Sequence, residues 1–398
     1  MTRTRARGVA GVLAVLAAAS GCSVRDTPTP GATQHPAAAR TATPTPSHAA
    51  APASTPTGCN PAAVLSGWST ARRAAQLVVA PAQEDDVLAA RPMVEAGVGG
   101  LLLFGSAAPA SLPTQLAALH RHALGGLPPL VMTDEEGGEI QRMANLVGNL
   151  PWPRTMAATM TTGQVRALAA QVGRRMRAAG ITMDLAPVLD LSDSPGPNAT
   201  YPDGPRSFSV HPAVATAYGL AFAEGLQDGG VIPVVKHFPG LGQASANTDF
   251  GRASVPPLGT LRSGALLPFA AAIRHGLPAV MVGEASIPGL THGLPATLSG
   301  AAIKGVLRGQ LGFHGLVLTD SLSAVAIQDA GYDIPQAAVR AIEAGADMVS
   351  FDAANPPVTT NQVITSLVSA VHSGQLPVAR LDSAVEHVLQ AKGRPACG

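Results

Sequence analysis

Eight short apolar runs, separated by alanine-rich stretches, constrain the fold of this chain more than any other feature. The stretches between them, such as residues 165–180 and 337–346, have the apolar spacing of amphipathic helices. The runs occupy residues 76–80, 100–104, 129–133, 182–188, 231–237, 279–284, 315–320 and 346–352. Eight strand–helix repeats predict an α/β fold of the (β/α)8 TIM-barrel type, whose parallel strands are apolar on both faces. We expect one domain over residues 59–398, with an open doubly wound sheet as the alternative.

Charged residues stand where several of these runs end. The six positions are Asp134 with Glu135 and Glu136, Asp184 with Asp190 beyond it, Lys236 with His237, Glu284, Asp320, and Asp352. The C-terminal ends of barrel strands form the active-site face, so these groups are expected around one mouth. Asp352 could instead cap the following helix. Because burying this much charge without a function is costly, the pattern predicts a polar binding site.

Composition narrows what such a site could bind. The net charge is +1 and only 13% of residues are charged, without a basic patch, so we expect no nucleic-acid partner. No glycine-rich nucleotide fingerprint follows a strand, and Lys236 would repel a cation from the neighbouring His237. We therefore expect neither a metal nor an organic cofactor. A pocket of carboxylates, arginines, one lysine and one histidine suits a polyhydroxylated ligand such as a sugar.

The first 22 residues resemble an export signal. Three arginines, at positions 3, 5 and 7, precede an apolar segment at residues 8–19 that is too short for a permanent membrane span. The segment ends in "AASGC", which is similar to a lipobox, although Ala19 stands where leucine is more usual. We expect an exported protein that is anchored to the outer face of the cytoplasmic membrane through a lipid on Cys22. Ordinary secretion is the alternative.

Residues 23–58 consist almost entirely of Ala, Thr, Pro and Ser, so we expect a disordered tether. If Cys22 carries a lipid, Cys59 and Cys397 remain, one at each end of the predicted domain. An exported protein can keep a disulfide, and a bridge between these two residues would join the ends of the fold. Two free thiols are the alternative.

Six segments together resemble the glycoside hydrolase family 3 β-N-acetylhexosaminidases, in their single-domain bacterial form. They are residues 133–143, 186–191, 206–226, 235–242, 295–299 and 315–323, and they follow the order and spacing of the family motifs. The resemblance covers essentially the whole predicted domain. It implies a TIM barrel that cleaves terminal β-linked N-acetylglucosamine from cell-wall fragments.

The resemblance also implies roles for individual residues. Asp320 matches the nucleophile, which would form a glycosyl-enzyme intermediate and so retain the anomeric configuration. Five residues match sugar-binding positions: Asp134, Arg142, Arg206, Lys236 and His237. Each of these five could instead belong to a structural ion pair at the rim of the barrel.

The loop after Lys236 departs from the family pattern. The family carries an Asp-x-His dyad there, and its histidine is the general acid/base. This chain has Asn247 and Asp249 at those positions, Leu241 in place of a glycine-flanked histidine, and no histidine within residues 238–251. Three explanations remain open. Asp249 could be the acid/base, Glu284 could supply the proton, or the protein could bind sugar with little turnover. Asp249 could also only cap the loop.

We therefore expect a monomeric, exported exo-glycosidase that acts on glycans containing N-acetylglucosamine. A catalytically impaired glycan-binding lipoprotein is the rival from another class. A β-glucosidase or a broader exo-hexosidase is the rival among enzymes.

Overall fold

The computed structural model describes residue 65 and residues 67–394. The predicted export signal, the tether, the lipid attachment at Cys22 and the bridge between Cys59 and Cys397 lie outside the described residues. Among residues 65 and 67–394, no helix combines the length and the apolar character that crossing a membrane requires.

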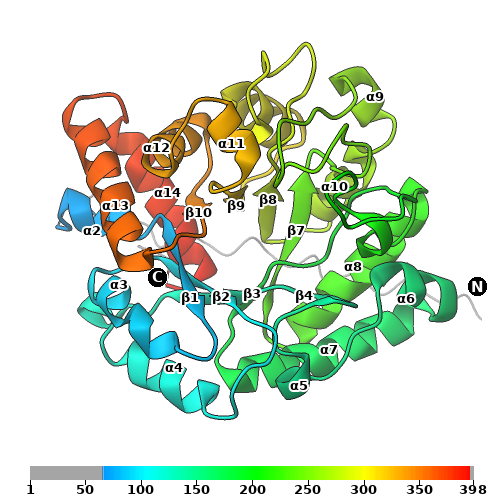
Figure 1. The fold of residues 1–398 in the computed structure, drawn as a ribbon, viewed down its shortest axis with the longest axis horizontal. Coiled ribbons are helices and arrows are strands. Elements are labelled where there is room, and N and C mark those ends of the chain that lie inside the picture. The colour runs from blue at the N-terminus through cyan, green and yellow to red at the C-terminus, as the bar shows by residue number, and fades with distance from the viewer. Residues whose placement is uncertain (1–64, 66, 395–398) are drawn as a thin grey trace, which may run out of the picture. The chain divides into compact units, whose positions relative to one another are not determined.

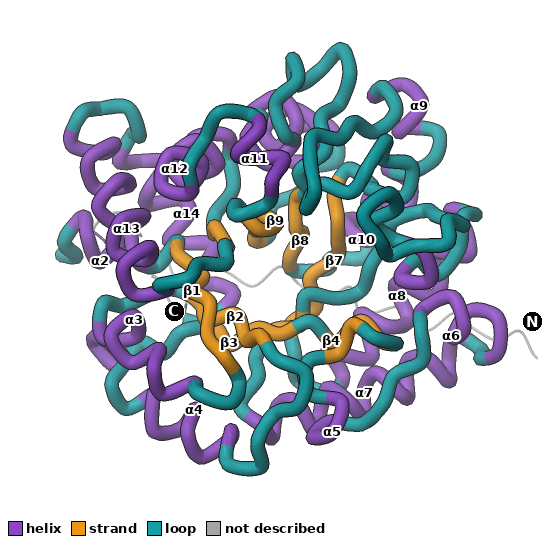
Figure 2. Tube along the Cα trace, in the orientation of Figure 1, coloured by secondary structure: helices purple, strands orange, loops and turns teal. Residues whose placement is uncertain are grey.

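Eight parallel strands close into a barrel with helices around it (Figures 1 and 2). Around the barrel the order is β1-β10-β9-β8-β7-β6-β3-β2. The strands are β1 (Val78–Gln83), β2 (Gly100–Phe104), β3 (Leu130–Thr133), β6 (Met183–Asp184), β7 (Ile232–Phe238), β8 (Ala279–Val282), β9 (Leu316–Ser321) and β10 (Met348–Ser350). Each predicted run supplies one strand, so the TIM-barrel prediction is confirmed. The open-sheet alternative is wrong, because β1 pairs with both β2 and β10.

The helices form the outer layer. The α-helices are α2 (Thr70–Ala75), α3 (Arg91–Glu95), α4 (Leu112–His120), α5 (Ala144–Val147), α6 (Pro153–Thr159), α7 (Thr162–Ala179), α8 (Pro212–Asp228), α9 (Leu258–Arg262), α10 (Leu266–Arg274), α11 (Val325–Asp329), α12 (Ile334–Ala344), α13 (Pro356–His372) and α14 (Val378–Ala391). Short 3-10 helices occupy Val87–Ala90, Leu124–Gly126, Gly204–Arg206 and Ala296–Leu298, and a π-helix occupies Ala301–Gln310. Local sequence explains the ends of α7, because Thr161 and Gln164 form a capping box and Gly180 is left-handed.

The interior of the barrel is filled by side chains. Met132, Met183, Val234, Met281 and Met348 belong to one buried apolar cluster there. A second, larger cluster lies between the barrel and the helices. Since the centre is packed, it leaves no channel for a ligand, and the active sites of barrels of this kind lie where the strands end.

A two-stranded hairpin that the sequence did not predict follows β3. It consists of β4 (Glu135–Gly137) and β5 (Ile140–Gln141), which pair antiparallel. The buried Glu135 carboxylate closes it, because Oε1 accepts backbone N–H groups from Arg142 and Met143 at 2.7 and 2.8 Å. The hairpin presents Glu136 and Arg142 on the same side of the barrel mouth as Asp134.

Candidate active site

A cavity of about 320 Å³ lies at the C-terminal ends of the strands. It is lined by seven of the eight predicted site residues: Asp134, Arg142, Arg206, Lys236, His237, Asp249 and Asp320. A larger depression, of about 850 Å³, lies against α12 and α13, but its only charged lining residues are Arg340 and Glu343. Those two residues are 3.6 Å apart and pair with each other. The smaller cavity is therefore the candidate site, because several cations and several carboxylates from different strand ends line it together.

Four of the lining residues form an ion-paired group, here called the cavity cluster: Asp134, Glu136, Arg206 and Lys236. Lys236 Nζ lies 2.6 Å from both Asp134 Oδ1 and Glu136 Oε1. Arg206 Nε and Nη2 each donate to a different oxygen of Glu136, at 2.8 Å. This two-pronged contact fixes both the distance and the plane of the guanidinium.

Burial and charge act in opposite directions on this cluster. Burial disfavours the ionised form of Glu136, but the charges of Arg206 and Lys236 outweigh it and lower the pKa of Glu136. Burial likewise works against the Lys236 ammonium, but Asp134 and Glu136 raise its pKa. The cluster is therefore charged before a ligand arrives, so binding requires little reorganisation of these groups.

Arg142 is held more loosely than the cavity cluster. Its Nη2 is 3.9 Å from Asp134 Oδ2, and a third of its side chain is exposed. The guanidinium carbon lies 6.0 Å from the centre of the Phe104 ring, which also lines the cavity. Arg142 is thus the lining cation with the most freedom to follow a ligand.

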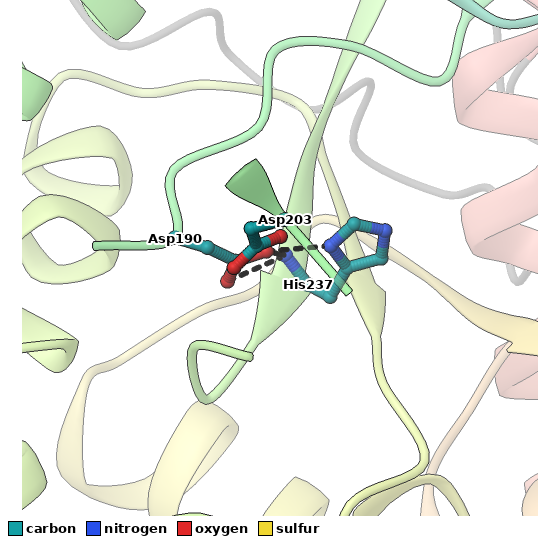
Figure 3. Close-up of side chains that lie close together, drawn as sticks. All are labelled: Asp190, Asp203 and His237. Atoms are coloured by element: carbon teal, nitrogen blue, oxygen red, sulfur yellow. Dashed lines mark hydrogen bonds and ion pairs between the residues drawn. The ribbon is translucent and has the colours of Figure 1, made fainter. Parts of the chain in front are cut away.

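His237 is bonded on both sides of its ring. Nδ1 lies 2.6 Å from Asp190 Oδ2, and Nε2 lies 3.3 Å from Arg206 Nη2. Asp190 and Asp203 lie beside it and are fully buried (Figure 3). Burial raises the pKa of Asp190 to about 7, although the backbone N–H groups of Leu241 and His237 oppose that rise. Burial also lowers the pKa of His237 to about 4, with a smaller contribution from the charge of Arg206.

Two glycines let the loop after β7 run close to its neighbours. Gly240 has a φ of +116°, and a Cβ there would lie 2.7 Å from the Cβ of Ala265. A Cβ on Gly242 would lie 2.0 Å from the carbonyl oxygen of Leu191. Between them Leu241 is buried, and its N–H donates to Asp190 Oδ1 at 2.8 Å. The first part of the loop is therefore tied to the segment that carries Asp190.

The far part of this loop is anchored differently. Asn247 Nδ2 donates to the Asn198 carbonyl at 3.0 Å, and the Thr248 carbonyl accepts the N–H of Ala326. Asp249 donates its backbone N–H to Asn247 Oδ1 at 3.0 Å, so Asn247, and not Asp249, is the residue whose side chain caps this turn. The Asp249 side chain lines the cavity and is exposed.

Asp320 lies at the end of β9, half-buried in the wall of the same cavity. The N–H of Ser321 donates to its Oδ1 at 2.8 Å. Asp249 and Asp320 thus line the same cavity.

Glu284 is the predicted site residue that does not line this cavity. It belongs to a neighbouring cavity of about 240 Å³ with Ser245, Arg252, Ser254 and Ser286. It is 2% exposed, and no donor among the described residues reaches its Oε1. Burial, together with the charges of Asp320 and Asp249, raises its pKa well above the usual value. The Glu284 carboxyl group therefore lies beside the cavity that Asp320 lines and not within it.

The sequence reasoning did not assign roles to Glu136, Asp190 and Asp203. All three are acidic and buried, and the first two were noticed only as charges near strand ends. Glu136 is separated from Arg206 by 70 residues, and Asp190 from His237 by 47. The sequence does show an unusual number of acidic residues near strand ends. It does not show which of these acidic residues contact Arg206 or His237.

A packed parallel barrel whose strand ends place cations and carboxylates around one cavity is typical of a TIM-barrel enzyme with a polar ligand site. The family described as "Glycosyl hydrolase family 3 N terminal domain" matches residues 70–391. The chain belongs to this family, and it is a glycosidase.

Close relatives agree with this assignment. The chain is 38% identical over 402 residues to the beta-hexosaminidase LpqI of Mycobacterium tuberculosis, covering 97% of this chain and 98% of that protein. The solved structure of M. tuberculosis LpqI covers 84% of this chain and 97% of its own, at 37% identity and a TM-score of 0.76. A beta-N-acetylhexosaminidase from Beutenbergia cavernae covers 82% of this chain and 98% of its own, at 31% identity and a TM-score of 0.72.

Proposed function

We propose that this glycosidase is a retaining exo-β-N-acetylhexosaminidase. It removes terminal β-linked N-acetylglucosamine from cell-wall glycans through a covalent intermediate on Asp320. The observation that carries the proposal is that Asp320, Asp249 and the cavity cluster face one cavity at the end of a filled barrel. The names of the beta-hexosaminidase relatives support the substrate class.

The size of the cavity supports exo action. Its volume of about 320 Å³ is near the lower end of ligand sites, which span about 300–1,000 Å³. The inner wall carries the cavity cluster, whose carboxylates accept sugar hydroxyls and whose cations donate to sugar oxygens. A terminal sugar residue would be enclosed, while the rest of the glycan would remain outside.

In the first step, an Asp320 oxygen bonds to the anomeric carbon as the bond from that carbon to the leaving oxygen breaks. The leaving oxygen takes a proton from Asp249, and the product is a glycosyl ester on Asp320. In the second step, Asp249 takes a proton from water, whose oxygen displaces Asp320 from the anomeric carbon. Two inversions return the original configuration.

We assign the proton transfer to Asp249 in preference to Glu284, because Asp249 lines the cavity that Asp320 lines. Burial raises the pKa of Glu284, as suits a proton donor, but Glu284 faces the neighbouring cavity. A sugar-binding protein with little turnover is the competing outcome, and the kinetic test below addresses it.

Nitrophenol release from the aryl β-N-acetylglucosaminide tests the proposal. Asp320→Asn keeps the side-chain shape and removes the nucleophile, so kcat should fall by about 10⁴-fold or more. Asp352→Asn is the matched control, because Asp352 is exposed after the next strand and does not line the cavity. If wild type is no faster than Asp320→Asn, the protein is not a glycosidase of this mechanism. Faster release from the aryl β-glucoside would instead indicate a β-glucosidase.

We also propose export and anchoring through a lipid on Cys22, as a monomeric enzyme at the cell envelope. The support is the arginine-led apolar segment that ends in "AASGC". Cys22→Ser should move the protein from the membrane fraction to the medium or the soluble fraction. Membrane association that survives this substitution would contradict the anchor.

A further inference from the structure

A buried pair of acidic residues lies directly behind His237 (Figure 3). Asp190 and Asp203 are both 0% exposed. Asp190 accepts the N–H of His237 at 3.2 Å on each oxygen, and the N–H of Leu241 at 2.8 Å on Oδ1. With His237 Nδ1 at 2.6 Å from Oδ2, Asp190 is surrounded by hydrogen-bond donors.

The contacts of His237 determine which ring nitrogen carries the proton. Nε2 faces Arg206 Nη2 at 3.3 Å, and a guanidinium nitrogen can only donate. Nε2 must therefore accept, and the proton of the neutral ring is on Nδ1, where it is donated to Asp190. The titratable groups that act on this ring besides Asp190 are Arg206, Lys236, Asp203 and Asp320, and none of them requires a second ring proton.

Asp203 has the opposite surroundings to Asp190. No N–H or O–H donor among residues 65 and 67–394 reaches either of its carboxyl oxygens. One of its carboxyl oxygens lies within 4.8 Å of a carboxyl oxygen of Asp190. Two buried carboxylates this close do not both ionise, and the donors around Asp190 favour the charged form there. The shared proton therefore belongs to Asp203, and burial acts in the same direction by raising the pKa of Asp203 well above its usual value.

A metal ion is the other explanation for three such groups within 4.8 Å of one another. A cation bound at Nδ1 would require the ring proton on Nε2, where it would face the guanidinium of Arg206. The positive charges of Arg206 and Lys236 would also repel the ion. A proton satisfies the same carboxyl pair without either conflict.

We infer that Asp203 is a positioning residue: a buried neutral acid that donates to Asp190 and thereby holds His237 with its Nε2 lone pair towards the sugar cavity. A hydroxyl of the bound sugar would then donate to Nε2, beside the donor that Arg206 offers. This inference deepens the proposed function. The sugar-binding measurement described below rests on that function. The two spectroscopic readouts need no substrate and so do not depend on that function.

The test compares Asp203→Asn with Asp203→Ala in the full chain. An asparagine amide keeps both the shape and the donor to Asp190, whereas alanine removes them. In ¹⁵N spectra of the free protein, wild type and Asp203→Asn should show Nε2 of His237 without a proton. The signal is identified among the 11 histidines by its loss in His237→Gln. Infrared spectra should show a buried carboxylic-acid band that disappears in Asp203→Asn.

Binding of free N-acetylglucosamine supplies the third readout. Asp203→Asn should bind within about threefold of wild type, and Asp203→Ala about tenfold more weakly, the loss expected for one good hydrogen bond. If Asp203→Ala does not fold, the asparagine variant decides alone. A protonated Nε2 in wild type, loss of the Nδ1-protonated form in Asp203→Asn, or one tightly bound metal ion per chain would each overturn the inference.

Discussion

Two buried charge clusters lie at opposite ends of the barrel, and they differ in what they face. The cavity cluster lies at the C-terminal strand ends and lines the site. The second, here called the basal cluster, surrounds Asp347 just before β10 and contains Arg308, Arg380 and His387. None of its members lines the sugar cavity.

Both oxygens of the Asp347 carboxylate in the basal cluster accept hydrogen bonds from protein groups. Arg308 Nη2 lies 2.6 Å from Asp347 Oδ2, and Arg380 Nη2 lies 2.9 Å from Oδ1. The N–H of Val317 donates to Oδ2 at 2.9 Å. Burial opposes ionisation of Asp347, but its bond with His387 and the nearby arginines lower its pKa. Both clusters contain buried charged residues, so burial alone does not identify a functional residue in this protein. Exposure to the cavity at the strand ends distinguishes the two clusters.

The largest effect expected in this comparison is a loss of activity on substitution of Asp249, which is exposed but lines the cavity. If access matters more than burial, Asp249→Ala should lower kcat by about 10²–10⁴-fold on substrates with poor leaving groups. The loss should be smaller with nitrophenol, which needs little protonation, and azide should restore turnover as the glycosyl azide. A loss that is equal for all leaving groups would show that Asp249 is not the acid.

The next effect is on stability alone. Asp347→Ala leaves the guanidinium groups of Arg308 and Arg380 around a buried vacancy and should lower the free energy of unfolding by about 3–5 kcal/mol. Denaturant titration measures this change, and kcat/KM of the folded fraction should stay near wild type. Asp228→Ala is the control, since the Asp228–Arg166 pair is about half exposed and should contribute less than about 1 kcal/mol. A large fall in kcat/KM for Asp347→Ala would break the comparison.

A matched pair of arginine-to-lysine substitutions, one in the cavity cluster and one in the basal cluster, should give smaller effects on activity and on stability, respectively. Arg206→Lys loses one of two contacts to Glu136, worth about 1.5–3 kcal/mol, so kcat/KM should fall by about 10–150-fold. Arg308→Lys makes the same exchange in the basal cluster. It should lower unfolding free energy by a similar amount and leave kcat/KM unchanged. Steady-state kinetics and denaturant titration of both variants check that Arg206→Lys loses activity and that Arg308→Lys loses stability.

Glu284→Gln should have the smallest effect on activity, within about twofold, because Glu284 faces the neighbouring cavity. Its stability effect depends on pH. The raised pKa means that folded Glu284 keeps a proton that the unfolded chain releases above about pH 4.3. The contribution of Glu284 to the free energy of unfolding of wild type therefore falls as pH rises, by up to about 1.4 kcal/mol per pH unit.

Glutamine does not titrate, so the variant should gain stability relative to wild type as the pH rises from about 5 to 8. Denaturant titration at several pH values measures the gain. A constant difference across that range would mean that Glu284 is ionised in the folded protein. A loss of activity comparable to that of Asp249→Ala would move the proton transfer to Glu284.

Much of the fold could be predicted because its signals are local. Apolar runs and helical periodicity repeat along the chain, and each predicted run contains or overlaps one barrel strand. Run 182–188 yields only the two-residue strand β6. Pairing continues beyond it through a bridge from Val188 to Lys236. The hairpin of β4 and β5 escaped prediction because a side chain, Glu135, holds it together in place of a regular apolar pattern.

The sequence by itself determined the barrel, the strand ends that carry charge, and the residue types at the mouth, since each depends on neighbours within a few positions. Only the tertiary structure decided which charges meet: Glu136 joins Arg206 and Lys236, and Asp203 joins Asp190 behind His237. It also separated Asp249 from Glu284 by assigning them to different cavities. The physical reason is that pairing and protonation depend on distance and burial, which chain closure creates between residues far apart in sequence.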